Sequence, residues 1–253
     1  MPSRRLPNSM PAVIRTLKTA RDAWKNTPLP ADRALTAEHW AKLDDTASNS
    51  FLNTLLKEAS DVDLALAAQA PLSNQFSQVY ARLTLFVSHF HQVLDMGIAR
   101  GTFAVGARSY YGRDIGASAI PDLTNLDAVM EAAENVVNGE TARGTAEGGN
   151  FVPMMLPSAR EVGLVRSQFL TLRAQQSQAV VTTDREREEL MALYTEAQAL
   201  AVDICDTVEY FYRKDPDPAS RRVKCQRWGV VYFYEPGETP EVPPAPPAPP
   251  PTP

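Results

Sequence analysis

Apolar residues recur at steps of three and four along most of the chain, which is the spacing of one helix face. The clearest run lies between residues 73 and 100, where one face holds Phe76, Val79, Leu83, Phe86, Phe90, Val93 and Ile98. A similar run covers residues 50–68, and Pro71 separates the two. Because proline interrupts the hydrogen bonding of a helix, the pattern predicts two helices here. Earlier helices are predicted to begin at Pro11 and after Thr36, a residue type that caps helix N-termini.

The region 158–213 predicts an antiparallel helical hairpin. Ser158 is a suitable cap for the first helix, and Thr183 and Glu186 have the spacing of a capping box at the start of the second. A lone hairpin exposes its apolar seam, so we expect the helices at 50–68 and 73–100 to complete a four-helix layer. The predicted fold class is therefore mainly α, an antiparallel bundle of four long helices with short accessory helices.

The middle of the chain departs from this pattern. Residues 101–125 combine glycines, two tyrosines and a proline, which predicts a long structured loop. A short helix at about 126–140 and another loop up to Pro157 follow. Loops of this length are often functional.

The C-terminal part changes character twice. A short basic helix is expected at 219–228, and residues 230–234 have the β-branched and aromatic composition of a strand. That strand must lie on the bundle, pair elsewhere in the chain or pair with another molecule. The predicted organisation is a flexible arm at 1–10, a helical-bundle domain at 11–234 and a disordered Pro-rich tail at 235–253.

The same C-terminal region resembles a group of uncharacterised helical bacterial proteins of the Bacteroidetes type. The resemblance rests on Asp206, Val208, Glu209, Phe211, Arg213, Lys214, Arg221, Arg222, Lys224, Trp228–Tyr232 and Pro236–Gly237. Ser88, Gln92–Leu94 and Tyr111–Gly112 are similar too. The resemblance implies a helical fold over most of the chain and no particular activity.

Charge and cysteine content narrow the function classes. The net charge of −5 argues against a dedicated nucleic-acid binder, although both ends of the folded part are basic. No apolar run is long enough to span a membrane. With only Cys205 and Cys225 present, we expect free thiols and a cytoplasmic location, with one structural disulfide as the alternative.

Sites for metals, cofactors and covalent catalysis are weakly indicated. His91 and Asp95 share a helix face, but two ligands do not make a metal site, and no Glu-x-x-His pair accompanies them. No phosphate-binding loop occurs. Cys225 lies among basic residues that could lower its pKa, although a structural thiol is favoured. We expect no catalytic residues, no metal and no cofactor.

Two groups of residues are candidates for an interaction surface. Tyrosine and arginine are frequent in such surfaces. The loop supplies Arg108, Tyr110, Tyr111, Arg113 and Asp114, and the C-terminal part supplies Arg221, Arg222, Trp228, Tyr232 and Tyr234. The structural alternative is that a loop arginine pairs with an aspartate while the tyrosines cover one end of the bundle.

The sequence thus favours a non-enzymatic structural or protein-interaction module that associates with itself or with another protein. The alternative is a small-molecule-binding or enzymatic helical protein, with its site at the bundle end near the 101–125 loop. A nucleic-acid accessory role is a third, weaker hypothesis.

Overall fold

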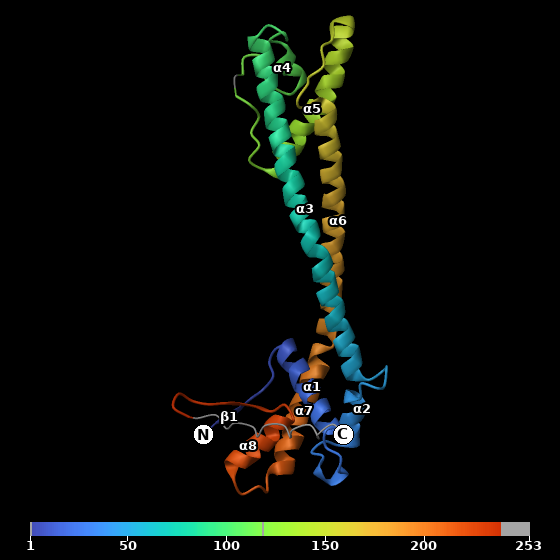
Figure 1. The fold of residues 1–253 in the computed structure, drawn as a ribbon, viewed down its shortest axis with the longest axis vertical. Coiled ribbons are helices and arrows are strands. Elements are labelled where there is room, and N and C mark those ends of the chain that lie inside the picture. The colour runs from blue at the N-terminus through green and yellow to red at the C-terminus, as the bar shows by residue number, and fades with distance from the viewer. Residues whose placement is uncertain (1, 118, 239–253) are drawn as a thin grey trace, which may run out of the picture. The chain divides into compact units, whose positions relative to one another are not determined.

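A computed structural model describes residues 2–117 and 119–238, and its fold is mainly α, as predicted (Figure 1). The α-helices are α1 (Met10–Lys25), α2 (Ala37–Leu43), α3 (Phe51–Ala99), α4 (Ala107–Tyr110), α5 (Leu126–Glu147), α6 (Ala159–Ala192), α7 (Tyr194–Tyr212) and α8 (Pro218–Arg227). Two 3-10 turns, η1 (Pro30–Asp32) and η2 (Gly148–Asn150), and two strands, β1 (Ser3–Arg5) and β2 (Val231–Phe233), complete the elements. Most of the Pro-rich tail predicted at 235–253 lies outside the described residues.

The described chain divides into two compact units, and the helical domain predicted at 11–234 contributes residues to both. Unit 1 comprises residues 2–64 and 184–238, and unit 2 comprises residues 65–117 and 119–183. Both boundaries fall within the long helices α3 and α6, so each of these helices contributes residues to both units.

Unit 1 is a cluster of helices around a shared apolar core. In α1, Val13, Leu17 and Ala20 recur at helical spacing and are fully buried, and Pro11 in the first turn needs no hydrogen bond there. They pack with buried residues of α2, the start of α3, α7 and α8. The indole rings of Trp24 and Trp40 stack at 5.4 Å and close one side of this core.

The predicted C-terminal strand finds its partner within the chain. β2 pairs antiparallel with β1, so that Arg4 lies opposite Tyr232, and residues 3–5 of the predicted arm are therefore part of the fold. Gly229, just before β2, has a φ of +94°, and a Cβ there would lie 2.8 Å from the carbonyl oxygen of Thr16. The close approach of this turn to α1 thus requires glycine.

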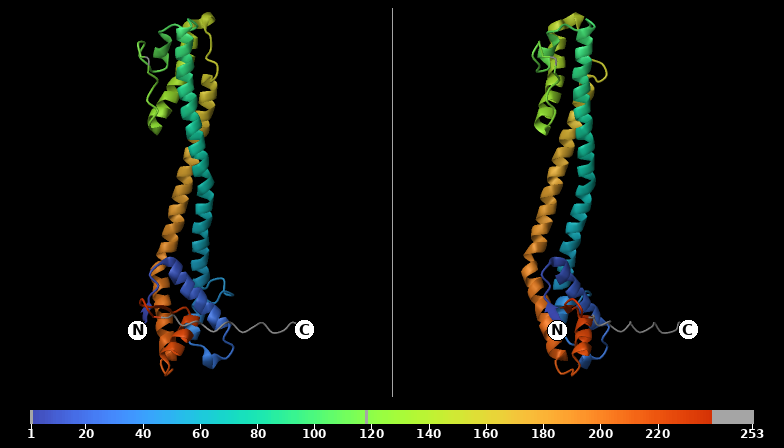
Figure 2. Two further views of the ribbon diagram at one scale, coloured as in Figure 1. Left: turned by 60° about the vertical axis from the view of Figure 1, so that its left-hand side comes forward. Right: turned by 90° about the vertical axis from the view of Figure 1, so that its left-hand side faces the viewer.

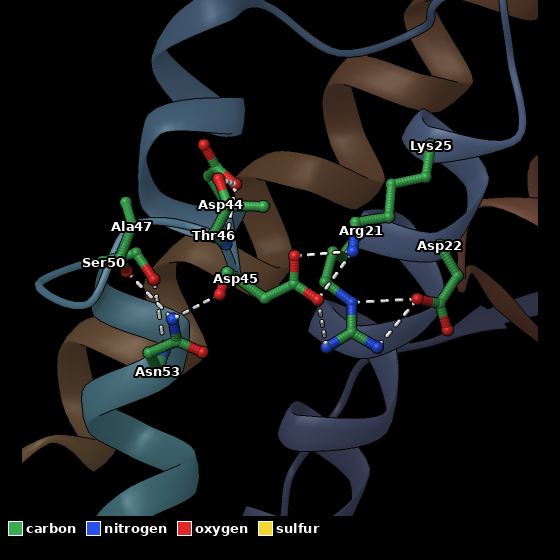
Figure 3. Close-up of polar contacts among 9 residues, drawn as sticks. All are labelled: Arg21, Asp22, Lys25, Asp44, Asp45, Thr46, Ala47, Ser50 and Asn53. Carbon is green, nitrogen blue, oxygen red and sulfur yellow. Dashed lines mark hydrogen bonds and ion pairs between the residues drawn. The ribbon is translucent and has the colours of Figure 1, made fainter.

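A polar cluster joins α1 to the turn that precedes α3 (Figure 3). Arg21 and Lys25 point from α1 towards Asp45, whose carboxylate accepts a 2.7 Å hydrogen bond from Lys25. Asn53, in the first turn of α3, donates to the backbone carbonyls of Asp45 and Ala47. These contacts stabilise the turn and pair its charges inside unit 1.

Unit 2 has its own core, formed by α3, α5 and α6. In both views of Figure 2, α5 lies beside the C-terminal half of α3. The buried residues are Val79, Leu83, Val87, Phe90 and Leu94 of α3, Val129, Ala132, Ala133 and Val136 of α5, and Ala159, Val162, Val165, Phe169 and Leu172 of α6, with Ala107, Tyr111 and Met154 from the connections. α5 extends to Glu147, beyond its predicted end near residue 140.

The hairpin predicted with a turn at residues 181–184 is wrong. α6 continues through that region, where the hydroxyl of Thr183 donates to the carbonyl of Ala179 in its own helix, 2.9 Å away, and does not cap a new helix. α3 also continues through Pro71, which was expected to separate two helices. Leu72 and Phe76, on either side of the next turn, pack against the core of unit 2 and hold the helix there.

Candidate functional site

The predicted loop arginines meet at one carboxylate of α3. Asp95 accepts hydrogen bonds from Arg108 Nε at 2.8 Å and from Arg113 Nη2 at 2.9 Å. Partial burial opposes the charged carboxylate, but the two guanidinium groups outweigh it and hold the pKa of Asp95 below its usual value. Asp95 thus holds the loop against α3 through two hydrogen bonds. The other aspartate, Asp114 of the loop, is exposed. This agrees with the structural alternative for both arginines.

The two loop tyrosines differ in environment. Tyr110 is at the surface, whereas Tyr111 is only 1% exposed. The Tyr111 hydroxyl donates to a carboxylate oxygen of Glu140 and accepts from Arg143 Nε at 2.8 Å. Burial, and then the bond to Glu140, raise the pKa of Tyr111, so this phenol is protonated near neutral pH. Of the five predicted loop residues, Tyr110 and Asp114 have exposed side chains.

Arg143 was not anticipated from the sequence, although it lies at the centre of this end of unit 2. The residue is completely buried and bonds to Glu140, Glu147 and the carbonyl oxygen of Val152. Its guanidinium also lies over the rings of Phe103 and Phe151, at 4.9 and 4.7 Å from their centroids. The Glu-x-x-Arg-x-x-x-Glu spacing of α5 was the available signal, but the same spacing also occurs on solvated helix faces.

A glycine lets the loop approach α5. A Cβ at Gly139 would lie only 2.2 Å from the carbonyl oxygen of Tyr110 and 2.7 Å from the ring of Tyr111. Glycine usually weakens a helix interior, and here it is required by the backbone that crosses above it.

His91 is the least satisfied polar side chain near this loop. It is completely buried, and neither of its ring nitrogens has a hydrogen-bond partner among the described residues. Burial and the nearby charge of Arg113 lower its pKa to about 4, against the opposing effect of Asp95. His91 and Asp95 were considered as two possible metal ligands. In the structure, both carboxylate oxygens of Asp95 accept hydrogen bonds from arginines instead.

In the C-terminal group, two aromatic residues serve the core of unit 1. Trp228 is buried and donates from Nε1 to the hydroxyl of Tyr212 at 3.1 Å. The Tyr232 hydroxyl donates to Glu209 at 2.8 Å, and burial followed by this bond raises its pKa. The hydroxyl of Tyr234 accepts from Gln226 at 3.2 Å. These contacts hold β2 and the end of α8 within unit 1.

The predicted residues Arg221 and Arg222 lie together at the surface. With Arg4, Glu209 and Tyr232 they line a hollow of about 350 Å³. A second hollow, of about 280 Å³, lies where the segment before α1 meets α7, and Arg5, Arg15 and Cys205 are among its lining residues. Among the C-terminal candidates, Trp228 is buried, whereas Arg221, Arg222, Tyr232 and Tyr234 are partly exposed.

Both thiols are free and buried. Burial raises the pKa of Cys205 to about 11. It also raises the pKa of Cys225, contrary to the alternative in which the neighbouring basic residues lower it. Neither cysteine is thus an activated nucleophile in this structure.

Another feature, found only in the structure, is an uncharged groove in unit 2. It has a volume of about 570 Å³ and is lined by Gln75, Gln78 and Val79 of α3 and by Gln168, Thr171 and Leu172 of α6. Three of these six side chains are amides, which both donate and accept hydrogen bonds. The groove can therefore bind a polar, uncharged surface.

The carboxylates of Glu58, Asp61 and Glu186 come within 4.8 Å of one another in unit 1. Lys57 pairs with both Glu58 and Asp61, and Arg185 pairs with Glu186. These two cations balance much of the negative charge of the cluster.

No protein-family model, curated protein or solved structure matches the chain. Among the helices of the described residues, none is long and apolar enough to cross a membrane. The functional argument therefore depends on the geometry of this chain alone.

Proposed function

We propose that the protein is a non-enzymatic interaction module that associates with a second copy of itself through the two-helix segment of unit 2. This segment comprises residues 65–78 of α3 and 173–182 of α6. The observation that carries the proposal is that neither stretch contains a buried residue. Elsewhere in unit 2, α5 covers these helices and a core forms.

The pairing within the segment is antiparallel and mostly polar. The hydroxyl of Thr183, directly after it, lies 3.2 Å from the side-chain amide of Gln69, and Gln176 donates to Ser73 at 3.4 Å. Further along, the rings of Phe76 and Phe169 lie 4.9 Å apart. Two helices that meet along one seam leave their other faces in solvent, and a bundle normally covers such faces with further helices.

The chemistry of the exposed faces supports a second copy as the partner. No charged residue occurs between Asp63 and Arg82 or between Arg173 and Asp184. A partner rich in charge would lose hydration here without gaining an ion pair. An identical segment brings no charge, matches amide with amide, and covers Leu66 and Val181, which are 39% and 60% exposed.

Two-fold symmetry would bring four helices together. The two helices of one copy would pack against the same two helices of another, since a two-fold interface uses the same patch on both chains. The four-helix layer expected from the apolar pattern of one chain would then be built by two chains. Pairing of the C-terminal strand with another molecule, one of the possibilities left by the sequence, is not needed, because β2 pairs with β1.

Sedimentation equilibrium of the full chain tests the proposal. We expect a monomer–dimer equilibrium in which the double substitution Gln75→Glu with Gln175→Glu shifts the chain towards monomer. Both residues are exposed in the two-helix segment, and the changes keep the side-chain shape while they add like charges to both copies of it. Gln92→Glu, at an exposed position of α3 outside the segment, should leave the equilibrium unchanged. A wild-type chain that stays monomeric at all concentrations would contradict the proposal.

The proposal also covers the location of the protein, its relatives and its binding to nucleic acid. The cytoplasmic location is supported by the two free, buried thiols. Kinship with the uncharacterised helical bacterial group is supported by the C-terminal residues, several of which, including Trp228 and Val230, belong to the core of unit 1. Nucleic-acid binding has less support, since Lys224 pairs with Asp215 inside unit 1.

A further inference from the structure

A hollow of about 460 Å³ in unit 1 is lined by cations from two separate parts of the chain. Arg33 directly follows η1, whereas Arg213 and Lys214 directly follow α7. The other lining residues are Ala34, Leu35, Thr36, Thr207, Tyr210 and Phe211, so three cations and no carboxylate line this basic hollow. Its volume lies within the range of about 300–1,000 Å³ that is usual for small-molecule sites.

The two arginines of the basic hollow are held in place by uncharged groups. The Nε of Arg33 donates to the carbonyl oxygen of Thr27 at 3.0 Å, and its guanidinium lies over the ring of Trp24, 4.6 Å from the centroid. The guanidinium of Arg213 lies over the ring of Tyr210, 3.4 Å from the centroid. These contacts orient both side chains without neutralising their charge. The arginines can therefore bind an anion at little further cost in side-chain entropy.

The acidic residues nearby do not balance these charges. Among the described residues, none of the three cations forms an ion pair with a carboxylate. Asp203 of α7 bonds to His39 at 2.9 Å. Asp215 pairs with Lys224 at 2.6 Å, and Asp32 of η1 does not line the hollow. Although the whole chain has a net charge of −5, the basic hollow is locally positive and attracts anions.

Part of this positive charge has an ordinary structural role. Cations at the C-terminal end of a helix interact favourably with its dipole, and Arg213 and Lys214 lie at the end of α7. That role does not account for Arg33, which belongs to another segment and is half-buried. It also does not account for the rings of Tyr210 and Phe211, which are 67% and 41% exposed beside these cations. Basic and aromatic side chains together are typical of sites for anions that carry a planar base.

We infer that the basic hollow binds a nucleotide, a small anion in which phosphate groups are joined to a planar base. The phosphate oxygens accept hydrogen bonds from Arg33, Arg213 and Lys214, because guanidinium and ammonium groups both bind phosphate. The base lies against the exposed rings of Tyr210 and Phe211, which stack with any base. This inference goes beyond the proposed function, since every lining residue belongs to unit 1 and self-association is assigned to unit 2.

Isothermal titration calorimetry of the full chain with adenosine diphosphate, in magnesium-free buffer, tests the inference. We expect binding that weakens as the salt concentration rises, because salt screens exposed charges. Adenosine lacks the phosphates and should not bind. Inorganic pyrophosphate lacks the base and should bind about tenfold more weakly, since stacking of one base typically has an effect of this size. A chain that does not bind adenosine diphosphate, or that binds pyrophosphate equally well, overturns the inference.

Substitutions locate the site. Lys214→Gln, at an exposed position, should weaken the binding of adenosine diphosphate about tenfold, the usual effect of losing one hydrogen bond to a charged group. Arg213→Gln should have a similar effect, and if this variant does not fold, Lys214→Gln decides alone. Arg227→Gln is the matched control, because Arg227 is also exposed in unit 1 but does not line the hollow. Wild-type affinity in the variants of the hollow would place the binding elsewhere and overturn the inference.

Discussion

The guanidinium of Arg143 donates a 2.8 Å hydrogen bond from Nε to the hydroxyl oxygen of Tyr111. This contact joins α5 to the residue that follows α4, two parts of the chain separated by the whole 112–125 loop. It also places a positive charge where no solvent reaches it. The stability of this end of unit 2 therefore depends on the partners of one arginine.

Replacing Arg143 by methionine should lower the free energy of unfolding by about 3 kcal/mol, the lower end of the range for breaking a buried ion pair. The change keeps most of the side-chain volume but leaves the carboxylate of Glu140 without its cation. Chemical denaturation followed by circular dichroism measures the effect. Arg187→Met is the control, because Arg187 pairs with Asp184 at the exposed surface and such pairs contribute about 0–1 kcal/mol.

Gly139→Ala should destabilise the protein by about 1–3 kcal/mol, the usual cost of adding a methyl group to a packed site. Alanine is the better helix former, but its Cβ would meet the carbonyl of Tyr110 at 2.2 Å. Gly106→Ala, where a Cβ meets nothing within 4 Å, should be nearly neutral. Equal unfolding midpoints for the two variants would show that the close approach at Gly139 is not required.

His91 should make stability depend on pH between about 6.5 and 4. Its pKa is lowered to about 4 in the folded chain, so folding favours the neutral imidazole. The stabilisation is fully present above pH 6.5, the ordinary value, and is lost as the pH falls towards 4, with a total on the order of 3 kcal/mol. Denaturation at a series of pH values should show this loss in the wild type. It should be reduced in His91→Gln and kept in His89→Gln, whose side chain is exposed.

Trp228→Ala should destabilise unit 1 by about 3–5 kcal/mol, as expected for a buried tryptophan. The substitution removes the hydrogen bond to Tyr212 and opens a cavity among α1, α7 and α8. Phe233→Ala, at an exposed position five residues later, should change stability by less than about 0.5 kcal/mol. Similar effects of the two changes would mean that Trp228 belongs to a surface.

The mainly helical fold class could be predicted from the sequence, because apolar residues that recur at helical spacing over a long stretch indicate which face of the helix is buried. Val79, Leu83 and Phe90 share one face in the sequence and one core in the structure. The local stop signals were misleading. Pro71 and Thr183 usually mark helix ends, yet both lie inside helices here. Contacts elsewhere along the two helices, such as that between Phe76 and Phe169, outweigh the preferences of single residues.

The candidate site was predicted less well, for a reason that concerns burial. Tyr111, Arg113 and Trp228 belong to residue types common at interfaces, and the structure buries all three. Whether an arginine is buried depends on residues far away in the chain. Arg143, for example, is enclosed by Phe103 and Phe151 from two different loops. No local pattern in α5 carries that information.

The division of the chain into units has a consequence for its synthesis. Unit 2 is complete once residue 183 has been made, whereas unit 1 needs residues from both sides of it. Strand β1 is made before unit 2, yet it must wait for Val231–Phe233 before its hydrogen bonds can form. Because domains fold as units while the ribosome adds residues, the middle of this chain should fold before its beginning. For that interval, the apolar face of α1 is without the residues of α7 and α8 that cover it in the finished protein.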